Sequence, residues 1–476
     1  MRNIISVILA AGQGKRMKSS LPKVLHLVAG VPMISYSLAL TKALGIKKRM
    51  VVLGYQAEEV KEIIKSIDEE VIYVYQKRQL GTAQALEEVK PYLTDFSGII
   101  LVLSADVPLL QQSTIQKIVN YHLNHPVVAT LLTAKLENPA GYGRVIRNQV
   151  GEIIDIVEQS DLKKGQEEIK EINAGIYCFN SKELFKALSL VNKNNYQKEY
   201  YLTDVIKILK EQGYLVGSVS VEDCQEIIGI NTREDLSQVS QIVYYRNALD
   251  HMSRGVTIIA PASTFIEKEV QIGEDTIIYP FTIITTGSKI GSNCHIGPYS
   301  HIVHSLIGDQ SRIFSSMVEQ SQIGNKVIIG PYAHLRPAST IGDEVKIGNY
   351  VEIKKTFIGE GSKVGHLTYL GDATLGKKVN IGAGTITCNY DGKKKNPTTI
   401  EDGVFIGSNN ALVAPVTIGQ DAYTAAGSTI TQDVPAQSLG IARSRQKNIL
   451  DWVTQKDKNR NKNKDKNNNQ KKNKNR

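Results

Sequence analysis

Short apolar runs alternate with helical patterns in the first half of the chain. The runs are rich in β-branched residues and cover residues 4–10, 49–53, 99–103 and 127–133. Apolar residues recur at helical spacing between some of them, over 32–44 and 57–67. This alternation predicts an α/β domain over residues 1–231, with a doubly wound, Rossmann-like and mostly parallel sheet. Its ligands should bind at the carboxyl ends of the strands.

The second half has a different hydrophobic period. Ile-Gly, Val-Gly or Leu-Gly pairs recur from Ile272-Gly273 to Ile418-Gly419, and successive glycines are often 6, 12 or 18 residues apart. This hexapeptide repeat predicts a left-handed parallel β-helix over residues 255–452, with three hexads in each coil of about 18 residues. A longer interval, from Gly382 to Gly407, predicts a loop inserted around Asn389–Thr398, and such insertions usually lie on a working face.

Two further segments complete the predicted organisation. Residues 232–254 carry Leu236, Val239, Ile242, Val243 and Leu249 at helical spacing, so a helical linker is expected there. Residues 453–476 form a basic tail. From Lys456 to the end the chain has ten Lys or Arg and two Asp, a net charge of 10 − 2 = +8 out of +10 for the whole chain. Because this tail carries no apolar residue from 456 onward, we expect it to be disordered.

Charge and cysteine content narrow the function classes. With the tail set aside, the body of the protein is near neutral, so no specific nucleic-acid partner is expected. The four cysteines, Cys178, Cys224, Cys294 and Cys388, are scattered without a metal or disulfide spacing, as is typical of a reducing compartment. The apolar run at 4–11 is too short for a signal peptide, and no run reaches the roughly 18 residues of a membrane helix. We therefore expect a cytoplasmic protein with no membrane partner.

Candidate chemistry in the first half follows the predicted strands. The first strand ends in a Gly-rich turn, Leu9–Met17, and Lys23 adds a second cation close by. Small residues let backbone N–H groups approach phosphates. A Gly81-Thr82 pair precedes a helical pattern, and Asp106 follows the strand at 99–103. A carboxylate at the end of a buried strand needs a partner or a metal. Each feature also has a plain structural interpretation: a turn, a surface lysine or a helix cap.

Candidate chemistry in the second half departs from the repeat. Arg336, the pair Glu352 and Lys354, and then His366 and Tyr369 fall about 18 and then 12 residues apart, which brings them towards neighbouring corners or edges. Histidine is the usual general base near neutral pH. A lone histidine is more often structural, but the cations and Tyr369 beside His366 favour a site for an anionic substrate.

The order and spacing of these motifs resemble one enzyme family. The motifs are LAAGQGKRM, LPKVLH, QLGTAQA, ADVPLL, GYGR (141–144), Ile156-Val157-Glu158, Asn173-Ala174-Gly175 and Gly229-Ile230-Asn231. Together they resemble sugar-nucleotide pyrophosphorylases. They are most similar to the bifunctional N-acetylglucosamine-1-phosphate uridylyltransferase/glucosamine-1-phosphate acetyltransferase family, over about residues 3–452. Three positions depart from the family pattern: Lys15 replaces a usual Thr, and Ala105 and Ala338 each replace a usual Gly.

The resemblance implies a uridylyltransferase site in the first domain. Its substrates would be UTP and N-acetylglucosamine-1-phosphate, with Mg²⁺ as cofactor. The residues implied to bind the nucleotide and the sugar are Leu9, Ala10, Ala11, Gly12, Lys23, Gln76, Gly81, Thr82, Gly141, Glu158, Asn173 and Asn231. The implied metal ligands are Asp106 and Asn231. The product, UDP-N-acetylglucosamine, would supply peptidoglycan, lipopolysaccharide or other cell-envelope precursors.

The resemblance implies a second, acetyltransferase site in the β-helix of a homotrimer. There His366 would deprotonate the amine of glucosamine-1-phosphate as it attacks acetyl-CoA. Four residues match the positions that bind glucosamine-1-phosphate: Arg336, Lys354, Tyr369 and Asn380. Six more match acetyl-CoA contacts: Ala383, Asn389, Tyr390, Ser408, Ala426 and Arg443.

Two other functions are compatible with parts of the sequence. One is a monofunctional sugar-1-phosphate nucleotidyltransferase, such as a glucose-1-phosphate adenylyl- or uridylyltransferase, whose β-helix only regulates or oligomerises. His366, the Asn389-Tyr390 pair and Arg443 argue against it. The other is a non-enzymatic scaffold with a tail that tethers RNA or membrane.

Overall fold

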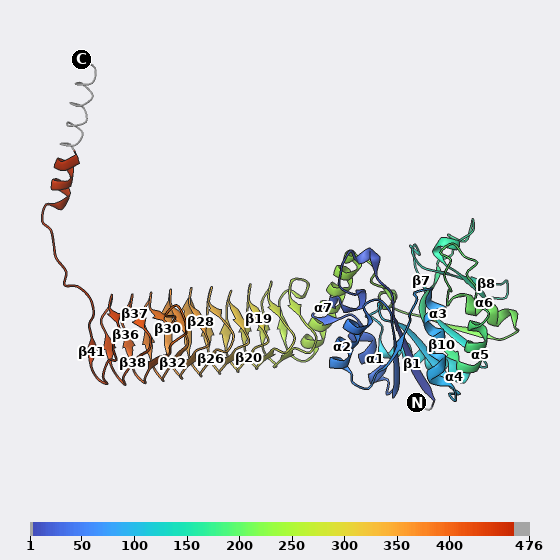
Figure 1. Cartoon of the computed structure of the whole chain (residues 1–476), viewed down its shortest axis with the longest axis horizontal. Coiled ribbons are helices and arrows are strands. Elements are labelled where there is room, and N and C mark those ends of the chain that lie inside the picture. Colours follow the sequence, from blue (N-terminus) through green and yellow to red (C-terminus); the bar gives the residue numbers. More distant parts are fainter. Residues whose placement is uncertain (1–2, 461–476) are drawn as a thin grey trace, which may run out of the picture. The chain divides into compact units, whose positions relative to one another are not determined.

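The computed structural model describes residues 3–460 (Figure 1). The chain divides into two compact units, one ending at Ser315 and the other beginning at Ser316. This division lies inside the predicted β-helix. The first coils therefore belong to the same unit as the α/β domain, whereas the predicted domain boundary was at 255.

A mixed sheet forms the centre of the α/β domain. Its main path runs β11-β7-β10-β6-β1-β4-β5, and β10 alone on this path is antiparallel to its neighbours. This confirms the predicted mostly parallel sheet. The strands are β1 (Ile4–Ala10), β4 (Lys48–Leu53), β5 (Ile72–Tyr75), β6 (Ile99–Ser104), β7 (Ala129–Lys135), β8 (Arg144–Arg147), β9 (Ile153–Val157), β10 (Glu171–Asn180) and β11 (Val216–Ser220), with a separate hairpin of β2 (Leu27–Val28) and β3 (Val31–Pro32).

Helices cover both faces of this sheet. Because side chains alternate along a strand, Val7 and Ile8 of β1 belong to two different apolar cores. Helices α1, α2 and α4 contribute to the core around Ile8, and α3, α5 and α6 to the core around Val7. The helices are α1 (Ile34–Ala43), α2 (Ala57–Ile67), α3 (Thr82–Glu87), α4 (Gln112–Asn124), α5 (Ser181–Leu188), α6 (Asp204–Glu211) and α7 (Arg233–Ser253).

Helix α7 occupies the range expected for the helical linker. Its start is fixed by a capping box: the Thr232 side chain accepts from the Asp235 N–H, and the Asp235 carboxylate accepts from the Thr232 N–H. Val239 and Val243 are buried in a small core that they share with the β2–β3 segment. The helix is thus packed against the α/β domain along part of its length.

Short strands build the coils in both units. In the unit that ends at Ser315, every third strand pairs in parallel, which gives three sheets. Most strands have an exposed or half-exposed residue followed by a buried one, so aliphatic side chains fill the interior. These strands are β12 (Thr257–Ile258), β13 (Phe265–Ile266), β14 (Gln271–Ile272), β15 (Ile277–Ile278), β16 (Ile283–Ile284), β17 (Lys289–Ile290), β18 (His295–Ile296), β19 (His301–Val303), β20 (Leu306–Ile307) and β21 (Arg312–Ile313).

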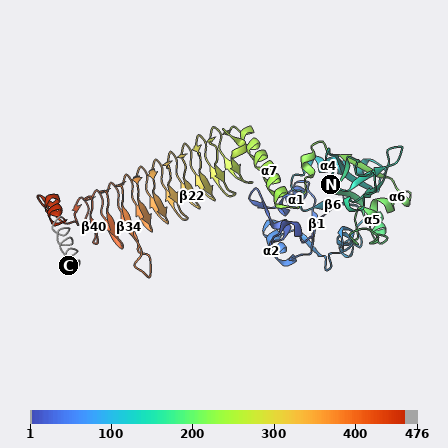
Figure 2. The same ribbon diagram turned by 90° about the horizontal axis from the view of Figure 1, so that it is seen from above.

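The unit that begins at Ser316 repeats this three-sheet pattern, which confirms the parallel β-helix; its left-handed sense stays a prediction. The inserted loop leaves the coils after β34 and returns at β35 (Figure 2). The strands are β22 (Met317–Glu319), β23 (Gln322–Ile323), β24 (Ile328–Ile329), β25 (His334–Leu335), β26 (Thr340–Ile341), β27 (Lys346–Asn349), β28 (Glu352–Lys354), β29 (Phe357–Ile358), β30 (Lys363–His366), β31 (Tyr369–Gly371), β32 (Ala373–Leu375), β33 (Asn380–Ile381), β34 (Ile386–Cys388), β35 (Thr398–Ile400), β36 (Phe405–Ile406), β37 (Ala411–Val413), β38 (Val416–Ile418), β39 (Tyr423–Thr424), β40 (Thr429–Ile430) and β41 (Leu439–Gly440).

The start of the tail differs from the sequence prediction. Residues 452–460 form an exposed helix, so the disorder predicted from residue 453 does not describe 453–460. The Lys456 ammonium lies 4.8 Å from the centre of the Trp452 ring, one helical turn away, and this cation–π contact favours the helix. The predicted disordered residues 461–476 lie outside the described residues. None of the helices described between residues 3 and 460 is both long enough and apolar enough to cross a membrane.

Close stacking of the coils predicts a difference between two glycines. Gly348 and Gly365 lie in the paired strands β27 and β30. A Cβ on Gly348 would lie 1.8 Å from the Gly365 carbonyl oxygen, whereas a Cβ on Gly365 meets nothing within 4 Å. We expect Gly348→Ala to lower the free energy of unfolding by about 1–3 kcal/mol, because the strands must separate to admit the methyl group. Gly365→Ala is the control in thermal and denaturant unfolding. Equal stability of the two variants would contradict this packing.

Candidate functional site

One cavity of about 800 Å³ opens at the carboxyl ends of β1 and β6. Ten of the predicted residues of the first site line it: Leu9, Ala10, Ala11, Gly12, Lys23, Gln76, Gly81, Thr82, Asp106 and Asn231. Lys15 also lines the cavity, but Ala105 does not. The Ala105 side chain is fully buried in an apolar core, so the methyl group at this departure from the family pattern points away from the cavity.

Charged groups gather at one end of this cavity. The Lys23 ammonium contacts the Asp106 carboxylate and also donates to Asn231 Oδ1 over 2.9 Å. Arg16 Nη2 donates to the same Asn231 oxygen over 2.9 Å. The Ile230 N–H donates to the Asp106 carbonyl over 2.9 Å, so backbone bonding holds the two segments together. Two cations, one carboxylate and one amide oxygen therefore meet at a single point.

The Asp106 carboxylate is kept ionised by its neighbours. Burial acts to raise its pKa, but the Lys23 charge and hydrogen bonds from Lys23 and Ser104 outweigh burial, so the pKa lies below the usual value. The Ser104 hydroxyl donates to Asp106 Oδ1 over 2.6 Å. Asp106 does not cap the following helix, because the N-cap of α4 is Gln111. The sequence left this helix-cap interpretation open, and the structure excludes it.

Asp106 and Asn231 are also suited to hold a hard cation. Their oxygens contact one ammonium, that of Lys23, so a single positive charge can bridge both. Between residues 3 and 460 no group of three or more His, Cys, Asp or Glu side chains could enclose a metal ion. A carboxylate plus an amide oxygen fits a metal that keeps most of its water ligands and binds substrate phosphates, as Mg²⁺ does.

The Gly81-Thr82 segment forms another part of the cavity wall. The buried Gln76 side chain donates to the Gly81 carbonyl over 3.1 Å. Gly81 has a φ of +120°, and a Cβ there would lie 2.4 Å from the Tyr200 carbonyl oxygen, so only glycine fits. Thr82 accepts from the Leu202 N–H over 3.0 Å. This wall is therefore held by the segment that precedes α6.

Three predicted sugar-binding residues lie outside this cavity lining, near β8 to β10. The Glu158 side chain accepts from the Thr203 hydroxyl over 3.1 Å, and burial raises the Glu158 pKa. The Asn173 side chain donates to the Tyr177 hydroxyl over 2.6 Å. The Gly141 N–H donates to the Gln159 side chain over 3.0 Å. Thr203, the partner of Glu158, follows directly after Leu202, whose N–H donates to Thr82 in the cavity wall. Glu158 is therefore connected to the cavity wall through two adjacent residues.

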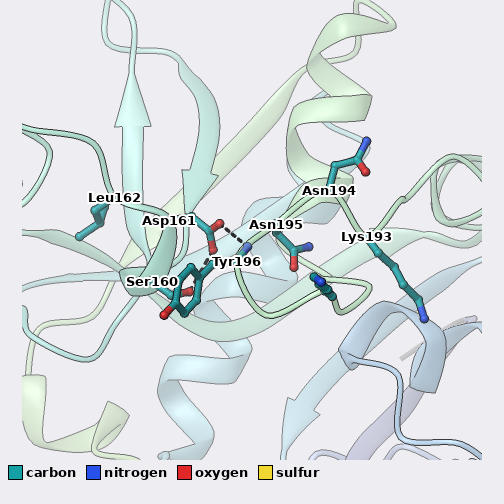
Figure 3. Close-up of a pocket in the computed structure, with 8 residues that line it drawn as sticks. Ser160, Asp161, Leu162, Lys193, Asn194, Asn195 and Tyr196 are labelled. Atoms are coloured by element: carbon teal, nitrogen blue, oxygen red, sulfur yellow. Dashed lines mark hydrogen bonds between the residues drawn. The ribbon is translucent and has the colours of Figure 1, made fainter.

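A second hollow, of about 790 Å³, holds none of the predicted site residues (Figure 3). Asp161 lies within it and accepts from the Tyr196 N–H over 2.8 Å. The loop that carries Tyr196 and Lys198 into this hollow also carries Gln197 and Glu199 into the lining of the first cavity. Sequence reasoning did not identify this loop, because it carries no recognisable motif.

Cations gather around the predicted phosphate-binding residues of the β-helix. Arg336 Nη1 donates to Glu352 over 2.8 Å, and Glu352 is paired in register with Tyr369 on the next coil. Contact with Lys395, from the inserted loop, lowers the pKa of Lys354, and the charge of Arg336 adds to this effect. Lys395 was not predicted, because only the return of the inserted loop brings it beside Lys354. Crowded cations of this kind favour an anionic ligand.

His366 stands at the end of β30, in a different sheet from Lys354 and Tyr369. It is exposed, and its Nδ1 is hydrogen-bonded to Asn349 Oδ1 on the preceding coil. Because an amide oxygen only accepts, this contact makes Nδ1 the donor, so Nε2 is the nitrogen of the neutral ring that can accept a proton. Asn380 lies on β33, the strand that pairs with β30. The histidine is thus oriented for use as a base.

The predicted acetyl-CoA residues fall into a line across successive coils. Arg443 Nη1 donates to the Ala426 carbonyl over 2.7 Å. The N–H of Gly427, directly after Ala426, donates to the Ser408 carbonyl over 2.8 Å. The N–H of Asn409, directly after Ser408, donates to the Ala383 carbonyl over 2.7 Å. The residue after Ala383 donates in turn to the His366 carbonyl over 3.3 Å. This line therefore ends at the candidate base.

The inserted loop carries the remaining two predicted contacts. Asn389 is buried at the base of the loop, and Tyr390 is exposed, with its hydroxyl donating to the Gly392 carbonyl over 2.8 Å. Inside the loop, the Asp391 carboxylate accepts from the N–H groups of Lys393 and Lys394 over 2.9 and 2.8 Å. These bonds give the loop a fixed internal structure.

Comparisons with known proteins agree with this arrangement. Residues 5–230 match the family described as nucleotidyl transferase, and residues 269–313, 320–355 and 397–432 match the bacterial transferase hexapeptide (six repeats). The chain is 48% identical over 456 residues to the bifunctional protein GlmU of Acetivibrio thermocellus, covering 96% of this chain and 98% of the relative. It is 49% identical over 448 residues to the GlmU of Geobacillus sp. strain WCH70, covering 94% and 97%.

A third relative, the bifunctional protein GlmU of Clostridioides difficile strain 630, is 46% identical over 456 residues, covering 96% of this chain and 98% of the relative. These alignments cover both the α/β domain and the coils. On these grounds the chain belongs to the bifunctional GlmU family.

Proposed function

We propose that this chain makes UDP-N-acetylglucosamine by two reactions at two separate sites. The β-helix transfers an acetyl group from acetyl-CoA to glucosamine-1-phosphate, and the α/β domain transfers a uridylyl group from UTP to the N-acetylglucosamine-1-phosphate. The main support is that each unit of a GlmU-family chain holds its own cluster of the side chains its reaction needs. A monofunctional nucleotidyltransferase would need neither the oriented His366 nor the cation cluster of the β-helix.

The first cavity suits nucleotidyl transfer. In this reaction a phosphate oxygen of the sugar phosphate attacks the α-phosphorus of UTP, a new P–O bond forms, and pyrophosphate leaves. Lys23 and Arg16 supply positive charge where the phosphates would lie. Mg²⁺ held by Asp106 and Asn231 would neutralise further phosphate charge. The Gly81-Thr82 wall and the Gly-rich turn would hold the nucleotide, and Gly141, Glu158 and Asn173 would hold the sugar.

The β-helix cluster suits acetyl transfer. His366 Nε2 would accept a proton from the substrate amine as the amine nitrogen attacks the thioester carbonyl; the C–S bond then breaks and coenzyme A leaves. Arg336 and Lys354 would bind the sugar phosphate, with Tyr369 and Asn380 at the sugar. The line from Ala383 to Arg443 would bind acetyl-CoA, because the Arg443 guanidinium suits a phosphate of the coenzyme.

We also propose that the protein is a cytoplasmic homotrimer that supplies cell-envelope precursors. All four cysteines are free thiols, which fits a reducing compartment. An exposed apolar column formed by Tyr332, Tyr350 and Leu367 runs beside His366, and the two tyrosine rings stack with centroids 5.5 Å apart. Such a column is suited to burial against a second copy of the chain.

Loss of the candidate base should separate the two reactions. We expect His366→Ala to lower acetyl-transfer kcat by about 10²–10⁴-fold, because the variant lacks the group proposed to accept the amine proton, and to leave uridylyl transfer unchanged. Coupled assays of each half-reaction measure this. His301→Ala, at another coil histidine, is the control. A parallel fall of both activities in a folded His366→Ala protein would argue against two independent sites.

Loss of the strand-end carboxylate should have the opposite effect. We expect Asp106→Ala to abolish Mg²⁺-dependent uridylyl transfer and to leave acetyl transfer intact; Asp95→Ala, at an exposed aspartate, is the control. Because Lys23 and Ser104 hold the pKa of Asp106 low, this carboxylate stays ionised between about pH 6 and 8, so its titration should not appear in the uridylyl-transfer profile over that range. Full uridylyl transfer by Asp106→Ala would remove this residue from the site.

The molecular mass of the protein in solution tests whether it forms a trimer. Light scattering of the full chain should give about three times 52.5 kDa, because the apolar column beside His366 needs a partner surface. Tyr350→Lys, which adds a charge to the column, should lower this mass, whereas Tyr245→Lys, at an exposed tyrosine of α7, should not. A monomer mass with full acetyl transfer would show that the site needs no second copy.

A further inference from the structure

Asp372 lies between the cation cluster and the inserted loop. It follows β31 and has a φ of +49°, in the left-handed region that a non-glycine residue seldom adopts. Its N–H donates to the Lys354 carbonyl over 3.1 Å, and its own carbonyl accepts from the N–H of Thr398, where the loop returns, over 3.2 Å. The backbone of one residue therefore connects a predicted phosphate-binding residue to the end of the loop.

The side chain of Asp372 holds the other end of the loop. Asn389 Nδ2 donates to Asp372 Oδ2 over 2.7 Å. The ammonium groups of Lys355 and Lys395 lie 3.7 and 4.0 Å from the carboxylate, and the Asp372 side chain is only 12% exposed. A carboxylate this enclosed is stable only with such partners. Asp372 is thus shared by the first residue of the loop and by two lysines.

We propose that Asp372 is a positioning residue of the acetyl-transfer site, which docks the inserted loop so that Asn389 meets acetyl-CoA and Lys395 meets the sugar phosphate. This inference rests on the proposed acetyl transfer. The loop is already ordered internally by Asp391, whose pKa is lowered to about 2 by hydrogen bonds from the Lys394 N–H and the Asn396 side chain. Asp372 is therefore needed for the placement of the loop and not for its formation.

The charge of Asp372 has a second consequence. Arg336, Lys354 and Lys395 repel one another, and contact with Lys395 lowers the pKa of Lys354. The Asp372 carboxylate acts in the opposite direction on both lysines and favours their charged forms. One negative charge at the edge of the cluster thus offsets the repulsion between the cations while the site is empty. In the complex, the negative charge of the substrate phosphate would offset it further.

Two substitutions at Asp372 separate these contributions. Asp372→Gly removes the carboxylate without backbone strain, because glycine adopts positive φ readily. Asp372→Asn removes the charge but keeps an oxygen that can accept from Asn389. The matched controls are Asp421→Gly and Asp421→Asn: Asp421 also has a positive φ of 55°, and its carboxylate also accepts from a side-chain amide, that of Gln420, over 3.3 Å.

Steady-state kinetics of both half-reactions, measured on the full-length protein, test the positioning role of Asp372. We expect Asp372→Gly to raise the KM for acetyl-CoA and for glucosamine-1-phosphate about tenfold each, with a smaller change in kcat, since His366 is untouched. In Asp372→Asn the KM for acetyl-CoA should return close to the wild-type value, whereas the KM for glucosamine-1-phosphate should stay raised. Uridylyl transfer should be unchanged in all four variants.

Each outcome has a distinct meaning. Wild-type KM values in Asp372→Gly would overturn the positioning role. Equal KM increases in the Asp421 variants would also overturn it, because they would show a general effect of corner aspartates on the β-helix. If the wild-type protein transferred no acetyl group at all, the failure would belong to the proposed function.

Discussion

Parallel hydrogen bonding between neighbouring strands determines where the central residues of both proposed sites lie. In the α/β domain, β1 pairs with both β4 and β6, so the Gly-rich turn and Asp106 emerge at the same edge of the sheet. In the coils, pairing in register places Tyr369 against Glu352 and His366 against Asn349. Residues far apart in sequence become neighbours because the backbone leaves no freedom to slip by one position without turning apolar side chains outward.

Both candidate sites place a carboxylate beside clustered cations. Each gathers cations for phosphate groups, and each sets a carboxylate beside them: Asp106 beside Lys23 in one site, and Asp372 beside Lys395 in the other. Without a counter-charge, cations crowded into a partly buried site would repel one another and destabilise the fold. The carboxylate keeps the cations in place before the substrate arrives. This arrangement is compatible with two candidate anion-binding sites on one chain without a large net charge on its body.

The sequence predicted features that depend on local pattern. Alternating apolar runs located β1, β4, β6 and β7 to within a few residues, and the glycine period predicted the parallel coils. Ten residues that the family resemblance implied line one cavity, where the carboxyl ends of neighbouring strands share an edge. The family that these motifs indicated was confirmed by relatives that match nearly the whole chain.

Features that depend on long-range contacts were not predictable. Lys395 and Asp372 carry no motif, and their roles follow only from the path by which the inserted loop returns to the coils. The link from Glu158 through Thr203 towards Thr82 joins three segments without a common pattern. The division of the chain at Ser315 lies within a continuous repeat, so no change of composition marks it. The helix at 452–460 includes a contact between Trp452 and Lys456, whereas the composition of this segment is typical of disorder.

One experiment tests most directly whether a single chain holds both activities. Purified full-length protein is incubated with glucosamine-1-phosphate, acetyl-CoA, UTP and Mg²⁺, and each component is omitted in turn while UDP-N-acetylglucosamine is measured. If one chain holds both activities, product forms only in the complete mixture, and N-acetylglucosamine-1-phosphate restores product when acetyl-CoA is left out. Product from N-acetylglucosamine-1-phosphate but never from glucosamine-1-phosphate with acetyl-CoA would show that the chain is a monofunctional nucleotidyltransferase.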